Sequence, residues 1–218
     1  MPLKSKNWEI VYFCAMIKTE TEAIIFDLGG VLINLDYQLT SKAFIDLGLT
    51  DFDATYSQLQ QTDLFDRFET GAISSFHFIN RLLDQLPQGT SGNKVVHAWN
   101  AMILDFPEER LLWLLEMKQR YRIFLLSNTN TLHMEAVRRS LERTIGHQRL
   151  EDYFEQVYLS FEMGLRKPNP EIFSRVCDEQ GLNPATTVFI DDSPQHVEGA
   201  RLAGLTAIHC TGKVEDLL

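Results

Sequence analysis

The chain has 218 residues, enough for one ordinary hydrophobic core plus an insertion, so stabilising disulfides are not required. Its formal net charge of −10 argues against a nucleic-acid partner, because phosphate backbones are bound by basic surfaces. No apolar run approaches the length of about 18 residues that a membrane helix needs, so no membrane partner is expected. The three cysteines are far apart and form no paired motif, which indicates a reducing, cytoplasmic location.

The N-terminus superficially resembles a signal peptide. Lys4 and Lys6 precede an apolar run at residues 10–17. The run is short, however, and no small-residue cleavage site follows it. We therefore interpret residues 1–21 as an N-terminal tail, much of which precedes an alternative start at Met16.

From residue 22 onward, short apolar runs alternate with segments of helical character. Pro107 and Pro170 suit the first turns of helices, and Gly181 and Gly204 suit helix ends. Runs without polar alternation are typical of parallel strands buried on both faces. Such runs occur at 23–26, 122–126, 156–160, 187–190 and 206–210, of which 156–160 is the weakest. The sequence thus predicts an α/β fold with a Rossmann-like, doubly wound parallel sheet.

The stretch 36–105 breaks this alternation. It is rich in aromatic residues, has no convincing apolar strand, and shows the helical spacing of Phe76, Ile79, Leu82 and Leu83. We predict that it is an inserted helical cap, and that 22–35 and 106–218 form the catalytic core. Its entry near Leu35 and exit near Phe106 would place it above the first strand.

Polar side chains follow the ends of three predicted strands and occupy one loop. Ligands of open α/β sheets bind at the carboxyl ends of the strands, so we expect these groups to converge. They are Asp27, the pair Ser127 and Asn128, Lys167 within Arg166-Lys-Pro-Asn-Pro170, and the pair Asp191 and Asp192.

Together these groups suit phosphoryl transfer, which needs a nucleophile, a cation and donors for the phosphate oxygens. Asp27 is the candidate nucleophile, because a carboxylate can form an aspartyl-phosphate. Asp191 and Asp192, with an oxygen of Asp27, offer the hard oxygen ligands that Mg²⁺ prefers. Ser127, nearby backbone amides and Lys167 would hold the phosphate, and the cap would exclude water.

These segments resemble, in order, the four motifs of haloacid dehalogenase-like hydrolases. The matching segments are Phe26-Asp-Leu-Gly-Gly-Val-Leu32, Leu125-Leu-Ser-Asn-Thr-Asn130, Gly164-Leu-Arg-Lys-Pro168 and Val188-Phe-Ile-Asp-Asp192 with Glu198-Gly-Ala200. Within that superfamily, the chain looks most similar to the bacterial alpha-glucose-1-phosphate phosphatase group.

The resemblance implies specific roles. Asp27 would be nucleophile and metal ligand, the Gly29 carbonyl a second ligand, Asp192 a third, and Asp191 would act through a bound water. Ser127, Asn128 and Lys167 would hold the phosphate. In the cap, Phe65-Asp-Arg-Phe-Glu-Thr-Gly71 looks like the pocket-facing turn of the family, and Arg67 or Trp99 is expected to touch substrate.

One position departs from the family pattern. Most phosphatases of the family have a second aspartate two residues after the nucleophile, where it serves as general acid and base. Here that residue is Gly29. This favours a substrate with a good leaving group, such as an anomeric or acyl phosphate, or a substitute base, for which His133 and Asp36 are candidates.

The expected function is Mg²⁺-dependent hydrolysis of a small phosphorylated metabolite, such as glucose-1-phosphate or an acyl phosphate, by a monomer or homodimer. Three alternatives stay open. A 2-haloacid dehalogenase would use the same Asp27 on carbon, without Mg²⁺. A receiver domain gathers similar groups but places its acidic pair at the first strand and lacks a long insertion. A non-catalytic pseudo-enzyme would explain Gly29.

Overall fold

The computed structural model describes residues 20–50, 52, 63–146 and 149–217. These residues form a parallel five-stranded sheet in the order β3-β2-β1-β4-β5. The strands are β1 (Ala23–Phe26), β2 (Arg122–Ser127), β3 (Gln156–Leu159), β4 (Thr187–Asp191) and β5 (Thr206–His209). All five apolar runs are therefore strands, and the predicted doubly wound fold is confirmed. The predicted tail lies, up to residue 19, outside the described residues.

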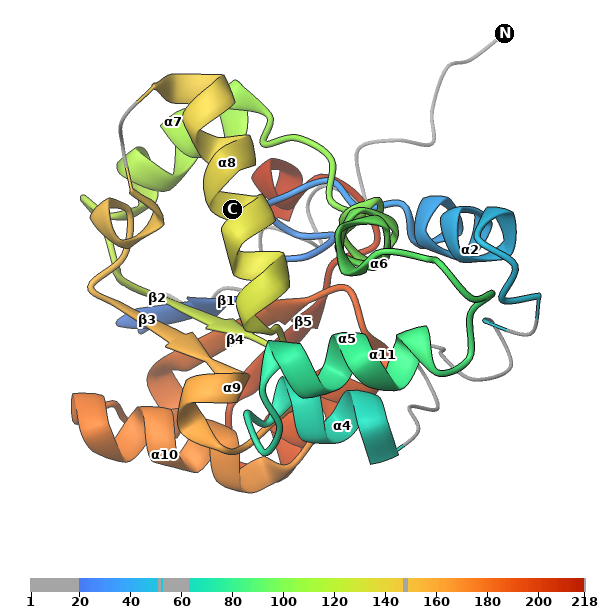
Figure 1. Ribbon diagram of the computed structural model, residues 1–218. Coiled ribbons are helices and arrows are strands. Elements are labelled where there is room, and N and C mark those ends of the chain that lie inside the picture. The colour runs from blue at the N-terminus through green and yellow to red at the C-terminus, as the bar shows by residue number, and fades with distance from the viewer. Residues whose placement is uncertain (1–19, 51, 53–62, 147–148, 218) are drawn as a thin grey trace, which may run out of the picture.

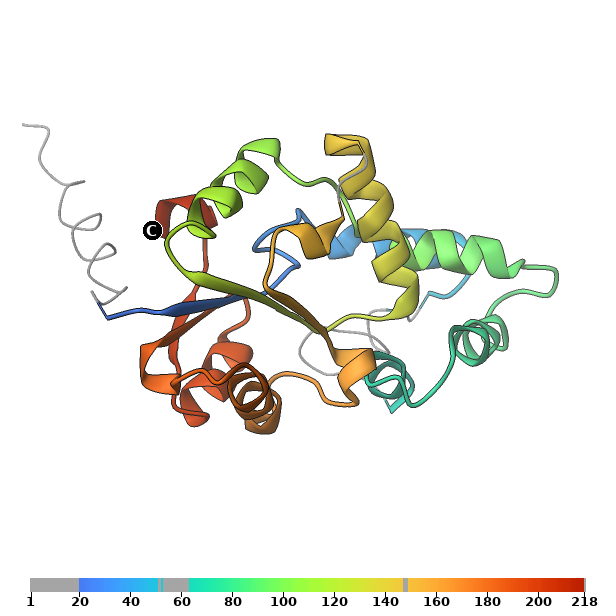
Figure 2. The same cartoon turned by 90° about the vertical axis from the view of Figure 1, so that its left-hand side faces the viewer.

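Helices cover both faces of the sheet (Figures 1 and 2). One face carries α7 (Glu108–Met117) and α8 (Thr131–Ile145), and the other carries α10 (Pro170–Gln180) and α11 (Pro194–Leu202). Successive side chains of a strand point to opposite faces. In β1, Ile24 and Phe26 accordingly join the core under α7 and α8, while Ala23 and Ile25 join the core under α10 and α11.

Shorter helical turns complete the connections. The helix α9 follows β3 directly, and 3₁₀ turns of the described chain lie before β3, before β4 and after β5. Their bounds are α9 (Ser160–Met163), η1 (Leu150–Asp152), η2 (Pro184–Thr186) and η3 (Val214–Leu217). Pro170 begins α10 and Gly181 is its C-cap, as the sequence predicts.

Between β1 and α7, the chain forms helices that lie beyond the carboxyl ends of the strands (Figure 2). They are α2 (Tyr37–Asp46), α4 (Asp63–Glu69), α5 (Ser75–Leu83) and α6 (Gly92–Asn100), and we call them the cap. The cap has its own aromatic core, in which the Phe65 and Trp99 rings stack with centroids 5.5 Å apart. A helical insertion after the first strand is confirmed, whereas its bounds of 36–105 stay a prediction.

The buried face of α5 differs from the expected one. Phe78 and Leu82 are buried, whereas Phe76 is 76% exposed. Ile79 and Leu83 pack beside the buried pair. Residues four apart share a helix face, while residue i+2 is turned by about 200°. A stripe centred on Phe78 and Leu82 therefore leaves Phe76 on the solvent side.

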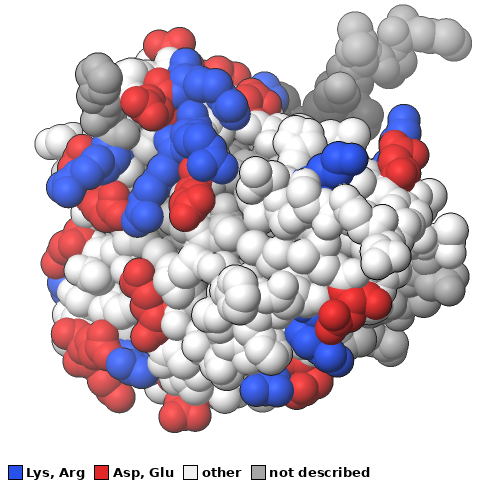
Figure 3. Space-filling model, viewed as in Figure 1, with Lys and Arg blue, Asp and Glu red and all other residues white. Residues whose placement is uncertain are grey.

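The surface charges are mixed. In Figure 3, blue and red side chains lie next to each other around the margin of the visible face, and its central part is mostly uncharged. Arg138 pairs with Glu151 and Arg139 with Glu135, so these arginines lie on a solvated, ion-paired helix face. Among the described residues, no helix combines the length and apolarity needed to cross a bilayer.

Candidate active site

Asp27 lies at the first residue beyond β1, at the carboxyl edge of the sheet. Its amide donates to the carbonyl of Ile190 in β4 at 2.9 Å, which extends the parallel pairing to the strand end. The chain then turns sharply, with the amides of Leu32 and Ile33 both donating to the Leu28 carbonyl. Only 7% of Asp27 is exposed. The carboxylate is thus held by the backbone at the centre of the sheet edge.

Lys167 joins the carboxylates of two neighbouring strands. Its Nζ lies 2.6 Å from Oδ1 of Asp27 and 2.7 Å from Oδ2 of Asp191, and the lysine is completely buried. Although burial lowers the pKa of Lys167, Asp191 and Asp27 outweigh it and raise that pKa. The ammonium is therefore a permanent positive charge beside Asp27.

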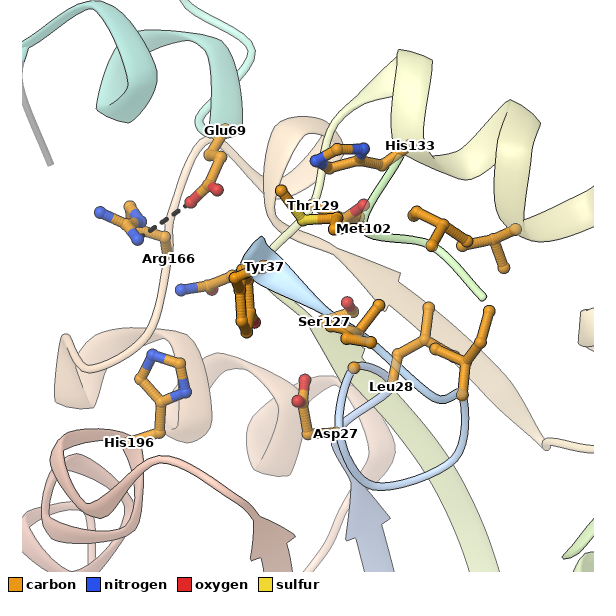
Figure 4. Close-up of a pocket in the computed structure, with 16 residues that line it drawn as sticks. Asp27, Leu28, Tyr37, Glu69, Met102, Ser127, Thr129, His133, Arg166 and His196 are labelled. Carbon is orange, nitrogen blue, oxygen red and sulfur yellow. Dashed lines mark ion pairs between the residues drawn. The ribbon is translucent and has the colours of Figure 1, made fainter. Parts of the chain in front are cut away.

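Asn128 fixes the loop that carries Lys167. Its Oδ1 accepts from the Lys167 amide at 2.9 Å, and its Nδ2 donates to the Lys167 carbonyl at 2.8 Å. The side chain predicted to hold phosphate is thus engaged with the protein backbone. Ser127, the last residue of β2, lies in the same cavity as Asp27 (Figure 4).

Asp192 completes an acidic cluster. Within the described chain, carboxylate oxygens of Asp27, Asp191 and Asp192 lie within 4.8 Å of one another. Gly30 makes this approach possible, because at its φ of 71° a side chain is disfavoured and a Cβ would collide with the Asp192 carboxylate. The sequence prediction of an acidic site at this edge agrees with the geometry.

The charges of the cluster fit a divalent cation. Burial, followed by the carboxylates of Asp27 and Asp191, raises the pKa of Asp192 to about 7. Burial also raises the pKa of Asp27, against the opposing effect of Lys167. For Asp191, Lys167 and His196 overcome the effect of burial and lower the pKa to about 2. Hard carboxylate oxygens with uncompensated negative charge are the donor set that suits Mg²⁺.

A cavity opens above these groups (Figure 4). Its volume is about 90 Å³. Phosphate and a few further heavy atoms fit such a space. Its walls include Asp27, Gly29, Ser127, Asn128, Tyr37, Glu69, Arg166, His133 and His196, with apolar side chains such as Leu35, Met102 and Val137.

Two predicted substrate contacts lie elsewhere. Arg67 is half exposed and pairs with Asp63 at 3.6 Å on the outer side of α4. Trp99 is buried in the cap core and stacks on His133. Neither residue lines the cavity.

The proposed substitutes for the missing acid differ in position. His133 reaches the cavity, but burial lowers its pKa to about 3, so its ring is neutral at neutral pH. Asp36 caps α2 by accepting from the Gln38 amide and does not line the cavity. Neither is a ready proton donor. At Gly29 itself, a Cβ would lie 2.6 Å from the Leu35 side chain, so an aspartate there would have to displace that leucine.

Four charged or titratable residues of the cavity, Tyr37, Glu69, Arg166 and His196, were not predicted from the sequence. Arg166 directly precedes Lys167, and Glu69 lies in the same segment as Arg67. His196 follows the Asp191-Asp192 pair. The Nδ1 of His196 lies 3.0 Å from the Asp191 carboxylate. Pairing between Arg166 and the cap gives no local sequence signal, because it joins residues about a hundred positions apart.

Comparison with known proteins decides the family. The family model for haloacid dehalogenase-like hydrolases matches residues 21–204. The chain belongs to this family. It is similar to the D-ribitol-5-phosphate phosphatase of Bacteroides thetaiotaomicron, with 32% identity over 174 residues, which cover 80% of this chain and 84% of that protein.

Solved structures agree with this assignment. A haloacid dehalogenase family enzyme of Bacteroides thetaiotaomicron, in complex with magnesium and inorganic phosphate, has a TM-score of 0.79 and 33% identity. The similarity covers 87% of this chain and 93% of that one. The L-2-haloacid dehalogenase of Xanthobacter autotrophicus has a TM-score of 0.57 and 20% identity, covering 87% of this chain and 77% of that one, which shows a shared fold alone.

Proposed function

We propose that the protein is a Mg²⁺-dependent phosphatase that hydrolyses a small phosphorylated metabolite through an aspartyl-phosphate on Asp27. The observation that carries this proposal is the buried contact of Lys167 with Asp27 at 2.6 Å, beside the cluster of Asp191 and Asp192. Family membership supports hydrolytic chemistry, and the similar ribitol-phosphate phosphatase supports a phosphorylated polyol or sugar as substrate.

In the first step, a carboxylate oxygen of Asp27 attacks phosphorus. The new bond between Asp27 and phosphorus forms as the bond between phosphorus and the leaving oxygen breaks. A carboxylate leaves as the anion, whereas an alkoxide takes a proton from a water molecule in the site and leaves as the alcohol. Lys167 neutralises charge on the phosphoryl oxygens, and Ser127, which lines the same cavity, offers a hydroxyl that can donate to them. Substrates with good leaving groups are favoured, because Gly29 supplies no acid.

In the second step, water attacks the phosphorus of the aspartyl-phosphate. The bond between Asp27 and phosphorus breaks, which restores the carboxylate and releases inorganic phosphate. The water needs a base, and Gly29 offers none. We therefore expect the second step to be slow relative to that of family members with an aspartate at this position.

Mg²⁺ would be held by the carboxylates of Asp27 and Asp192 and the carbonyl of Gly29, with Asp191 contributing through a water. When bound, the ion supplies positive charge that lets a phosphate dianion approach this acidic edge. The other contributions come from the chain itself. The position of the cap over the sheet edge favours exclusion of bulk water from Asp27.

The test is a phosphate-release screen over sugar, polyol and acyl phosphates. The wild type should release phosphate with Mg²⁺ and lose activity in EDTA. Asp27→Asn should lose activity by about a thousandfold or more, because the amide is a far poorer nucleophile. Asp178→Asn, which makes the same change at an exposed site on α10, should keep wild-type activity.

Two results would contradict the proposal. Activity retained by Asp27→Asn would remove Asp27 as nucleophile. Turnover of a 2-haloacid that EDTA does not affect, with phosphate esters inert, would instead indicate a dehalogenase, because displacement at carbon needs no Mg²⁺.

A further inference from the structure

Arg166 connects the phosphate end of the site to the cap. It directly precedes Lys167, yet its guanidinium reaches α4, where Nη1 donates to Oδ1 of Asp66 at 3.0 Å. Its Nη2 lies 2.9 Å from Oε2 of Glu69 (Figure 4). The Arg166 and Glu69 side chains are 21% and 8% exposed, while that of Asp66 is 50% exposed. The ion pair with Glu69 is therefore the less screened of the two.

Glu69 is held in place by the contact between cap and core. The turn after α4 contains Gly71, whose φ is 70° and whose Cα faces the backbone carbonyl of Phe161 in α9. A side chain at this position would collide with that carbonyl. The close approach fixes the end of α4 against the core, and with it the position of the Glu69 carboxylate.

Both members of this ion pair line the cavity, whereas Asp66 does not. Figure 4 shows that Glu69 and Arg166 lie at the other end of the cavity from Asp27. The leaving group of a phosphate bound at Asp27 would lie toward this ion pair. The positive charge of Arg166 is already balanced there by carboxylates. A leaving group with its own negative charge would face Glu69 and gain little from Arg166. A neutral hydroxyl group suffers no such repulsion.

Arg166 has one donor to spare for such a hydroxyl. Its Nε is buried and has no hydrogen-bond partner within the described part of the chain. A buried N–H is normally paired, and a small movement of the Arg166 side chain on ligand binding would bring this one to an oxygen of the leaving group. The carboxylate of Glu69 can in turn accept from a hydroxyl hydrogen. The pair thus presents both a donor and an acceptor.

We infer that Glu69 and Arg166 determine specificity for the leaving group, selecting uncharged, hydroxyl-bearing groups and disfavouring groups with a carboxylate or a second phosphate. This inference rests on the proposed phosphatase function. It restricts the substrate class to monophosphates of sugars or polyols, with the charge of Glu69 as the selecting element.

Two esters that differ in a single group test the inference. Glycerol 3-phosphate carries a terminal hydroxymethyl group where 3-phosphoglycerate carries a carboxylate. Each is measured as a competitive inhibitor of p-nitrophenyl phosphate hydrolysis in the presence of Mg²⁺, so that neither ester has to be turned over. The readout is the ratio of the two inhibition constants, with KM and kcat for p-nitrophenyl phosphate recorded separately.

The wild type should bind glycerol 3-phosphate more tightly. Glu69→Gln should shift the ratio toward 3-phosphoglycerate by about tenfold or more, since it removes the repelling charge and frees Arg166. Arg166→Gln should shift the ratio in the opposite direction, because it leaves Glu69 unbalanced. The variant with both substitutions should not show the shift toward 3-phosphoglycerate that Glu69→Gln alone produces, because it lacks the Arg166 charge. Because the two single variants are expected to change the ratio in opposite directions, either one alone can test the inference if the other folds poorly. Thermal melting followed by circular dichroism detects poor folding.

Asp63→Asn is the matched control. It removes one negative charge from the same helix, but the Asp63 side chain is 84% exposed and lies outside the cavity, so the ratio should not change. Equal inhibition constants in the wild type, or a ratio that neither single variant changes, would overturn the inference while leaving the phosphatase intact. Failure of the wild type to hydrolyse any phosphate ester would instead reject the proposed function.

Discussion

His133 is a buried histidine that contacts the cap through uncharged groups. Its ring stacks on Trp99 with centroids 4.7 Å apart, and its Nδ1 lies 2.9 Å from Oδ1 of Asn100. An amide oxygen only accepts, so Nδ1 carries the proton and Nε2 is an acceptor. Its place in the cavity wall thus suits a hydrogen bond from a substrate hydroxyl better than proton donation.

This histidine predicts how stability depends on pH. Burial lowers its pKa from the ordinary 6.5 to about 3 in the folded state. Above pH 6.5 neither state binds the proton, whereas below it only the unfolded state does. The contribution of His133 to the free energy of unfolding should therefore fall by up to about 1.4 kcal/mol per pH unit as pH drops from 6.5 toward 3.

Urea unfolding of the wild type and His133→Gln across this pH range measures the effect. The variant should have a shallower slope below pH 6.5. His97→Gln, which replaces an exposed histidine of α6, should keep the wild-type slope. Equal slopes for the wild type and His133→Gln would show that His133 is not held neutral by burial.

At the scale of elements, the loop between α9 and α10 is positioned by β2. Both hydrogen bonds between Asn128 and the Lys167 backbone cross from the end of β2 to this loop. On the other side, Asn169 caps α10 by accepting from the Glu171 amide at 3.0 Å. Lys167 thus lies between two fixed points. The hydrogen bonds of Asn128, which we call the brace, hold the Lys167 backbone itself, whereas the Asn169 cap stabilises only the start of α10.

Asn128→Ala should cost about 1–3 kcal/mol of stability, because it leaves buried backbone groups of Lys167 without partners. It should also lower kcat by roughly tenfold or more, since Lys167 loses its fixed position beside Asp27. Asn169→Ala is the control, with a stability loss of about 1 kcal/mol and little change in kcat. Steady-state kinetics and urea unfolding provide both values, and equal effects on kcat would argue against the brace.

At the scale of the whole molecule, the sequence predicted the features that depend on the order of the strands. Runs such as Ala23–Phe26 are apolar on both faces, so the sheet and the convergence of Asp27, Lys167 and Asp191 followed from topology. The cap was harder, because aromatic residues lie on more than one side of its helices. Phe76 was expected inside the helical stripe, yet it is exposed.

The part of the cavity away from Asp27, which Arg166 and Glu69 line, was not predicted from the sequence, and the reason is physical. The ion pair of Arg166 with Glu69 depends on how α4 packs against the core, and no local pattern encodes that packing. Trp99 was expected to touch substrate, but its large apolar ring is buried in the aromatic core of the cap. The positions of groups at strand ends therefore followed from topology, whereas the positions of the cap side chains depended on tertiary packing.

The central claim is that Asp27 carries the phosphoryl group. Because Gly29 supplies no base for the second step, the phosphorylated enzyme should accumulate during turnover. The most direct measurement is rapid quenching during turnover, borohydride reduction of the acyl phosphate, and mass spectrometry of the peptide that contains Asp27. We predict conversion of Asp27 to homoserine, dependent on substrate and Mg²⁺. Conversion at another residue, or none during full turnover, would contradict the account.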